Sequence, residues 1–213
     1  MSGTILAIET STPRGSIALV STSGEALFSV AFESNRSHNS LLFEPLERAL
    51  KLPNPLNYVV VGTGPGSYTG VRIGISAALG ISLVKKVPVV GISSLCGLDD
   101  APSDGIYPVI GDARRGSYFW AEVNHWKLVG DPEICSSDEL VSRPKASTRP
   151  PLTCDRTELP VPAKITHPSA ERLARTALHT LDPAQLSDSA PVEPIYLRAP
   201  YITTPKPKGR PKS

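Results

Sequence analysis

The stretch that most constrains the fold runs from residue 58 to residue 95 and reads YVVVGTGPGSYTGVRIGISAALGISLVKKVPVVGISSL. It opens with an aromatic and β-branched run, 58–61, that is typical of a buried strand. A glycine-rich loop and a segment with helical spacing follow, and a second β-branched strand is expected at 87–90. A strand, a helix and another strand in succession predict two parallel strands joined by a right-handed crossover. The stretch therefore favours an α/β fold.

The expected helix, 69–85, carries a stripe of small side chains. Four of them recur at every fourth position: Gly70, Gly74, Ala78 and Ser82. A glycine inside a helix costs about 1 kcal/mol relative to alanine, so two glycines indicate that another backbone approaches closely. Two alternatives remain for the backbone that packs against this stripe: the protein's own sheet, or a helix of a partner protein. In the partner alternative, Leu42 and Leu46 of the preceding helix add apolar area, and all six residues form the expected interface.

Three strands and a helix are expected before this unit. Segments 4–10, 15–21 and 25–33 read as an antiparallel meander, and 38–51 reads as a helix with one apolar face. Three meander strands, a helix, a strand, a helix and a fifth strand predict a ribonuclease-H-like α/β layer. We assign this N-terminal domain to residues 1–100.

A similar succession begins again after the central stretch. Its expected elements are strands at 105–111, 117–124 and 126–129, a short helix capped by Ser137, strands at 152–154 and 163–165, and a helix from Pro168 to 181. Of the chain's 22 prolines, 13 lie beyond residue 143, which indicates a loop-rich unit. We therefore expect a reduced C-terminal domain of the same type at 101–197, followed by a basic, proline-rich tail at 198–213.

Charge gives limited information about partners. The chain carries 22 Lys and Arg against 20 Asp and Glu, and a net charge of +2 does not indicate nucleic-acid binding by the whole chain. Four of the cations lie in the last ten residues, where no acid occurs. Such a tail is typical of a disordered, solubilising segment, and contact with tRNA is its alternative. For Arg114 and Arg115 the same two alternatives are an exposed turn and a tRNA phosphate contact.

The sequence favours a cytoplasmic protein. A strand-like segment follows Met1, so we expect no signal peptide. Glycine and serine interrupt the longest apolar run, so we expect no membrane span. The three cysteines, Cys96, Cys135 and Cys154, fit neither a disulfide framework nor a zinc-site spacing.

The chain contains, in this order, ILAIETSTPRGSIAL, a segment around His38, VGTGPGSYTGVRIGISAALG, PVVGISSL, IGDARRGSYFWAEV and PIYLRAPY. Together these segments resemble the TsaB (YeaZ) family. The resemblance implies two actin-like (ASKHA) domains, the second degenerate. It also implies a non-catalytic subunit that holds TsaD while TsaD transfers threonylcarbamoyl to the tRNA adenosine 3′ of the anticodon. The ATPase TsaE joins the complex, and tRNA is contacted through the complex.

The residues agree with a non-catalytic role. TsaD holds a metal with two histidines spaced H-x-x-x-H, and in this chain His38 takes the first place while Leu42 takes the second. One imidazole without its helical partner is a poor metal site. We therefore expect no metal, no catalytic residue and no bound cofactor in this chain, and we expect ATP and a metal on the partner proteins. Pairing of the isolated chain as a homodimer is left open.

Five residues are candidate contacts for an anion or a nucleotide: Glu9, Thr10, Gly64, Gly66 and Ser67. Backbone amides in a glycine loop at a helix start can bind a phosphate. The loop nevertheless lacks the G-x-x-x-x-G-K-[ST] and G-x-G-x-x-G patterns, and a structural turn is the alternative. Two other functions stay open beside the scaffold: an independent actin-like ATPase and a metallopeptidase-like protein.

Overall fold

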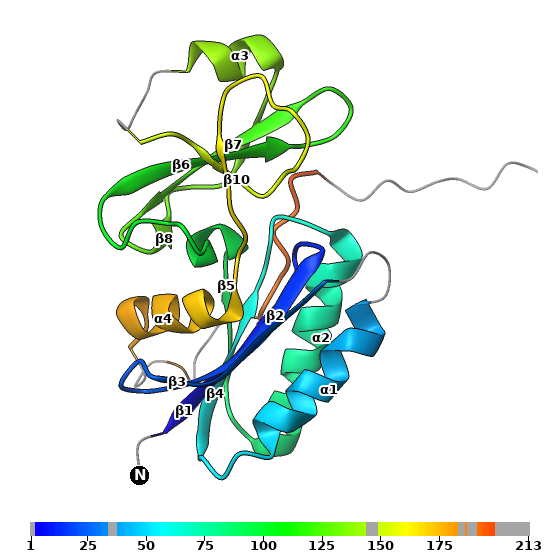
Figure 1. Ribbon diagram of the computed structural model, residues 1–213, viewed down its shortest axis with the longest axis vertical. Helices are drawn as coiled ribbons and strands as arrows, with labels where there is room; N and C mark the ends of the chain where they lie inside the picture. The colour runs from blue at the N-terminus through cyan, green and yellow to red at the C-terminus, as the bar shows by residue number, and fades with distance from the viewer. Residues whose placement is uncertain (1–2, 34–37, 144–148, 183–185, 187–190, 199–213) are drawn as a thin grey trace, which may run out of the picture.

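The computed structural model describes residues 3–33, 38–143, 149–182, 186 and 191–198. Figure 1 shows two β-sheet units stacked along the long axis of the molecule, the N-terminal unit below and the second unit above. Nearly all of the basic tail expected at 198–213, and with it the suggested tRNA contact of the tail, lies outside the described residues.

The first sheet has five strands: β1 (Thr4–Glu9), β2 (Arg14–Ser21), β3 (Ala26–Glu33), β4 (Leu56–Gly62) and β5 (Val89–Ile92). Their spatial order is β3-β2-β1-β4-β5. β2 is antiparallel to both of its neighbours, whereas β4 is parallel to β1 and to β5. β1 is buried along its whole length because helices cover both faces of the sheet. This is the ribonuclease-H-like arrangement, so the predicted fold class is confirmed.

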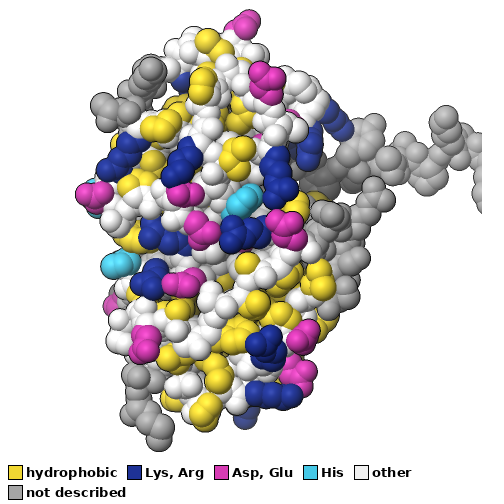
Figure 2. All heavy atoms as spheres, in the orientation of Figure 1, with side chains coloured by type: hydrophobic (Ala, Val, Ile, Leu, Met, Phe, Trp, Pro, Cys, Tyr) yellow, Lys and Arg dark blue, Asp and Glu magenta, His cyan; other side chains and the backbone are white. Residues whose placement is uncertain are grey.

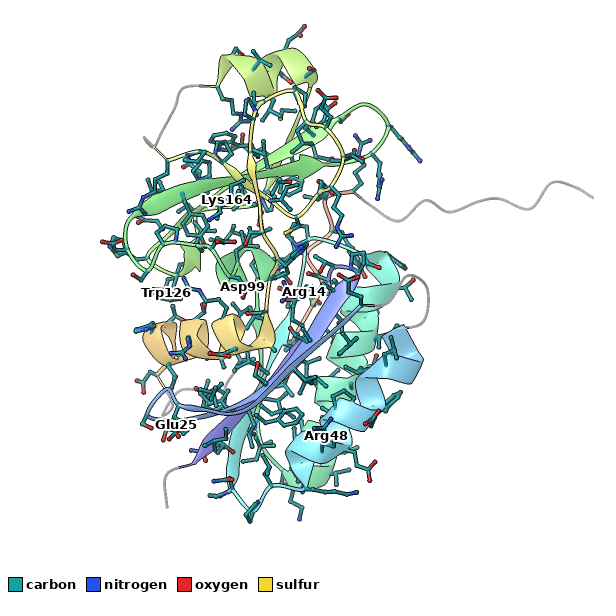
Figure 3. All side chains as sticks on the ribbon, in the orientation of Figure 1. Arg14, Glu25, Arg48, Asp99, Trp126 and Lys164 are labelled. Atoms are coloured by element: carbon teal, nitrogen blue, oxygen red, sulfur yellow. The ribbon has the colours of Figure 1, made fainter. Side chains whose placement is uncertain are left out.

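Helices from distant parts of the chain form the two layers on this sheet. Figure 1 shows α1 (His38–Leu50) and α2 (Tyr68–Lys85) on one face and α4 (Ala170–Thr180) on the other. α4 covers an apolar face that includes Ile5 and Val20. The helix expected near the end of the C-terminal domain therefore packs on the first sheet, which corrects its expected place in the 101–197 unit. The second unit reaches α4 through Trp126, whose ring stacks on His179 with centroids 4.7 Å apart (Figure 3).

The second sheet repeats the first one in reduced form. Its strands are β6 (Ile106–Asp112), β7 (Tyr118–Asn124), β8 (Lys127–Leu128), β9 (Glu133–Cys135), β10 (Leu152–Thr153) and β11 (Lys164–Ile165). The order is β11-β10-β6-β7-β8, with β9 also paired to β7. β10 is parallel to β6 and to β11, as β4 is to β1 and β5. Only the short α3 (Ser137–Ser142) stands in the place of α1, and the described segment between β10 and β11 holds no helix.

A shared apolar core holds the two units together. The core under α4 continues from Ile5 and Leu98 to Tyr107 and Val109 of β6. Figure 2 shows acidic, basic and histidine side chains gathered over the junction on the surface. One ion pair there, between Arg14 and Asp99, spans 3.8 Å with both side chains about 40% exposed (Figure 3). Exposed pairs typically contribute less than about 1 kcal/mol, so the buried core is the dominant contact.

The stripe of small residues on α2 faces the protein's own sheet. A Cβ added at Gly70 would overlap the Thr10 carbonyl oxygen, and one added at Gly74 would overlap Thr10 Oγ1. Ala78 is completely buried, and Ser82 Oγ donates to the Val87 carbonyl oxygen. Of the two alternatives, close approach to the sheet is therefore the correct one. The expectation that Gly70, Gly74 and Ala78 meet a partner helix is wrong, because the sheet already occupies that face.

The helices begin near the expected residues, with different caps. Ser67 caps α2, since its side chain accepts from the Gly70 amide. Ser136, not Ser137, caps α3 and forms a reciprocal capping box with Glu139. Ser169 caps α4 just after the expected Pro168 start. Within the described residues no helix combines the length and the apolar character needed to cross a bilayer.

The packing of α2 predicts opposite effects for one substitution at two positions. Gly74→Ala inserts a methyl group against Thr10 and should destabilise the fold by about 1–3 kcal/mol. Gly80→Ala meets no atom within 4 Å and should stabilise the fold by about 0.5–1 kcal/mol, because alanine favours the helix. Chemical denaturation of both variants measures the difference. Equal effects would contradict the sheet-facing stripe.

Candidate functional site

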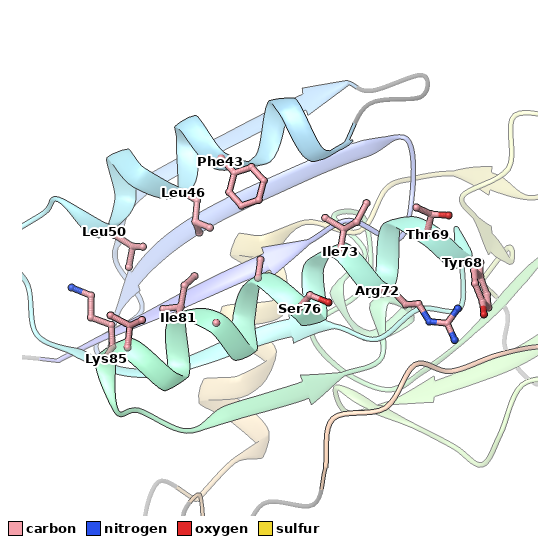
Figure 4. A pocket seen from close by; sticks show the side chains of 13 residues that line it. Phe43, Leu46, Leu50, Tyr68, Thr69, Arg72, Ile73, Ser76, Ile81 and Lys85 are labelled. Carbon is pink, nitrogen blue, oxygen red and sulfur yellow. The ribbon is translucent and has the colours of Figure 1, made fainter.

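An apolar groove of about 720 Å³ runs along the outer side of the α1–α2 pair. Figure 4 shows side chains of α1 and α2 that point into the space between the two helices. The lining residues are Phe43, Leu46, Leu50, Tyr68, Thr69, Arg72, Ile73, Ser76, Ala77, Gly80, Ile81, Val84 and Lys85. The groove is therefore the main candidate site on the described part of the chain.

Large apolar side chains remain exposed at and beside this groove. Leu83 is 82% exposed, Val84 78% and Phe43 59%. Leu83 and Val84 remain exposed because α2 buries only part of its apolar surface, namely Gly70, Val71, Gly74, Ile75, Ala78 and Ile81. Contiguous exposed apolar surface of this kind marks an interaction site. Leu46 lines the groove although only 6% of it is exposed, whereas Leu42 is completely buried and is not available to a partner.

Sequence reasoning missed most of the groove. Phe43, Arg72 and Val84 were not among the expected interface residues, although they line it. A signal was present: a helix that covers one face of a sheet needs one apolar stripe, and α2 has more than one. The additional apolar residues, such as Ile73 and Ala77, identify the outward face.

The glycine loop between β4 and α2 is bonded to the rest of the protein. The Gly64 amide donates to Ser94 Oγ at 3.1 Å, and the Ser67 amide donates to the Ser11 carbonyl oxygen at 2.7 Å. The Gly70 amide donates to Ser67 Oγ. These three amides are therefore not available to an anion, which favours the structural-turn alternative for this loop. Gly66 and Ser67 are exposed, but Gly64 is buried.

Glu9 and Thr10 lie at the carboxyl end of β1, beneath this loop. Thr10 Oγ1 donates to the Gly70 carbonyl oxygen at 2.8 Å. Glu9 is completely buried, and its Oε1 accepts from the Ser11 amide. A Cβ added at Gly62 would overlap Glu9 Oε2, so the loop starts with glycine because the carboxyl group needs that space. Neither residue is exposed to a nucleotide in solution.

Burial is the main cause of the pKa shifts of the acid and thiol groups that could act in catalysis. It raises the pKa of Glu9 above its ordinary value, against smaller opposite effects from hydrogen bonds to Ser11 and Ser94. Burial also raises the pKa values of Cys96 and Cys154 to about 12, so both are neutral thiols at physiological pH. No group of three or more His, Cys, Asp and Glu side chains is placed to hold a metal in the described ranges. The side chain of His38 lies outside what the structure describes.

The turn between β6 and β7 carries Arg114 and Arg115 at its exposed tip. Both residues have positive φ values, 67° and 59°. The Arg114 guanidinium pairs with Asp112 at 3.2 Å, and the Arg114 amide also donates to that carboxylate. The exposed-turn alternative therefore describes Arg114 and Arg115, and their tRNA contact stays a prediction.

Comparison with known proteins gives consistent results. Residues 32–145 match the family TsaD, described as tRNA N6-adenosine threonylcarbamoyltransferase. The tRNA threonylcarbamoyladenosine biosynthesis protein TsaB of Escherichia coli K12 is 34% identical over 127 residues, which cover 55% of this chain and 54% of that protein. The protein of the same name in Bacillus subtilis 168 is 34% identical over 123 residues, covering 54% and 53%. The chain thus spans about half the length of these curated relatives.

A solved structure supports the fold alone. It is a crystal structure of a Pseudomonas aeruginosa protein described as uncharacterised and similar to the peptidase YeaZ. The TM-score is 0.70 at 23% sequence identity, and the alignment covers 92% of this chain and all of that one.

The buried acid predicts a pH-dependent stability. Because the folded pKa of Glu9 is raised above 4.5, the folded chain binds this proton more tightly than the unfolded chain does. The resulting stabilisation is complete below about pH 4.5 and is lost as the pH rises through the folded pKa. Glu9→Gln resembles the neutral acid, so its melting temperature should exceed that of the parent near neutral pH and approach it in acid.

Thermal unfolding across this pH range measures the difference, with Glu25→Gln as the matched control. Glu25 is exposed at the β2–β3 turn, far from the loop (Figure 3), and its variant should follow the parent at every pH. If Glu9→Gln also follows the parent, the folded chain does not hold this proton.

Proposed function

The chain belongs to the TsaB (YeaZ) family, and from this premise we propose that it is a non-catalytic subunit in the synthesis of threonylcarbamoyladenosine on tRNA. In this proposal it holds and activates TsaD, which transfers threonylcarbamoyl to the adenosine 3′ of the anticodon. The two proteins form a heterodimer in the cytoplasm, and TsaE joins them. ATP and the metal belong to the partners, and tRNA is contacted through the complex.

The exposed groove on α1 and α2 is the observation that carries the proposal. It presents two parallel walls of apolar side chains, with Phe43 on one helix and Val84 on the other. A pair of helices from TsaD fits this surface, because ridges of apolar side chains pack into the groove between two helices. The matched region, 32–145, includes both α1 and α2, so TsaD is expected to have counterparts of these helices. The complex would then contain a four-helix bundle.

The buried centre supports a non-catalytic role. Glu9 is shielded from solvent, three amides of the loop are bonded to the protein, and Cys96 and Cys154 are neutral thiols. Neither the ATPase nor the metallopeptidase alternative gains a comparable observation. An ATPase needs an accessible phosphate site, and a peptidase needs a metal set or an activated nucleophile.

Reconstitution tests the role directly. The chain alone, mixed with tRNA and threonylcarbamoyl-adenylate, should not modify the tRNA. Adding it to TsaD and TsaE should restore modification that TsaD and TsaE lack without it. Mass spectrometry of the digested tRNA measures the product. Modification by the chain alone, or no gain on adding it, would contradict the proposal.

The same Val→Ser substitution at two exposed positions tests whether TsaD docks on the groove. Val84→Ser removes apolar surface from the groove and should weaken TsaD binding about tenfold, as expected for the loss of about 1.4 kcal/mol. Val129→Ser is the matched control, since Val129 is also half or more exposed but lies on the second unit. Isothermal titration measures both affinities. Equal affinities would place the TsaD contact elsewhere.

A further inference from the structure

One guanidinium group is held in place at an end of the groove. Arg72 lies on α2, and its guanidinium carbon stands 3.6 Å from the centroid of the Tyr68 ring and 5.2 Å from that of Tyr196. The two rings stack on each other at 5.2 Å with an interplanar angle of 29°. Figure 4 shows Arg72 and Tyr68 together at one end of the groove and Lys85 at the other. Stacking on aromatic faces restrains a guanidinium while its N–H edges stay open to a ligand.

Tyr196 lies beside Tyr68 and Arg72 because segment 191–198 packs against the glycine loop. The Ile195 amide donates to the Thr63 carbonyl oxygen at 2.8 Å, which fixes segment 191–198 beside the glycine loop. Val192 packs into the core beneath α1 and α2, next to Gly91. Tyr196 is therefore positioned by tertiary contacts on both sides of the loop. Arg72 is ordered before any partner arrives, which lowers the entropy cost of using it in an interface.

Arg72 has no acidic partner in the part of the chain that the structure describes. Among the described residues it takes part in none of the ion pairs, and no hydrogen bond is found for its side chain. The charged residues that line the groove are Arg72 and Lys85, and no Asp or Glu lines it. The groove therefore combines an apolar floor with unneutralised positive charge at its two ends.

We propose that Arg72 is the receptor for a carboxylate on the helix that docks in this groove. The occupant is an amphipathic helix of the partner, with an Asp or Glu beside its apolar stripe at the Arg72 end. A planar guanidinium binds a carboxylate through two parallel hydrogen bonds, and this fixes the register of the docked helix as well as its affinity. The inference rests on the proposed function, since it specifies the chemistry of the partner surface that the groove accepts.

Affinity for TsaD from the same organism tests the proposal at about 50 mM and about 500 mM NaCl. Arg72→Gln should weaken binding about tenfold at the lower salt, and the loss should shrink at the higher salt because ions screen the pair. Arg72→Lys keeps the charge but lacks the planar guanidinium, so its affinity should lie between those of the parent and Arg72→Gln. Arg48→Gln is the matched control: Arg48 also stacks on an aromatic ring, 5.4 Å from the centroid of Phe28, but lies outside the groove lining. It should bind like the parent.

A second measurement changes the partner as well, and its single TsaD variants do not depend on how well the Arg72 variants fold. Each Asp and Glu of the first two TsaD helices is changed to its amide, alone and combined with Arg72→Gln. One position should show a loss that is not additive with that of Arg72→Gln. Full additivity at every position would overturn the proposal that Arg72 binds a carboxylate, and so would parent-like binding by Arg72→Gln at low salt. Neither result would contradict TsaD as the partner. A parent chain that does not bind TsaD, or that pairs only with a second copy of itself, overturns the proposed partner and this inference together.

Discussion

The close contact between α2 and the end of β1 determines the arrangement around it. Thr10 lies where a Cβ on Gly70 or Gly74 would stand, and its hydroxyl donates to the Gly70 carbonyl oxygen. The helix can approach the sheet so closely only because these residues lack side chains. The contact buries the small residues of α2 together with Val71, Ile75 and Ile81, and it leaves other apolar residues such as Leu83 and Val84 exposed. The groove is thus a consequence of how the sheet is covered.

The acid at the end of β1 is closed off from solvent beside this contact. Glu9 is buried under a loop whose glycine at position 62 leaves just enough space for the carboxyl group. Ser94 and Ser11 accept the loop amides that a phosphate would otherwise contact. The buried acid and the loop amides therefore make internal contacts, whereas apolar side chains line the exposed groove.

The second unit depends on the first. Its sheet has the same strand order, but α3 spans only Ser137–Ser142, and the described residues between β10 and β11 form no helix. α4 instead returns to the first sheet, so one core crosses the junction. Segment 191–198 then returns to the glycine loop and brings Tyr196 to Tyr68 and Arg72. The end of the described chain is therefore coupled to the start of α2, beside the groove.

The order of the elements followed from local sequence, because hydrophobic period and turn residues act over a few neighbours. That signal predicted β1 to β5, both long helices of the first unit and the reduced repeat. It left open which face of α2 meets the sheet, since that depends on Thr10, which lies 60 residues from Gly70. It did not indicate that α4 packs on the first sheet, because the pattern of a helix shows that it needs an apolar surface but not which one. Only the tertiary structure decided these points and the stacking of Tyr196 on Tyr68, since each depends on surfaces that other parts of the chain leave uncovered.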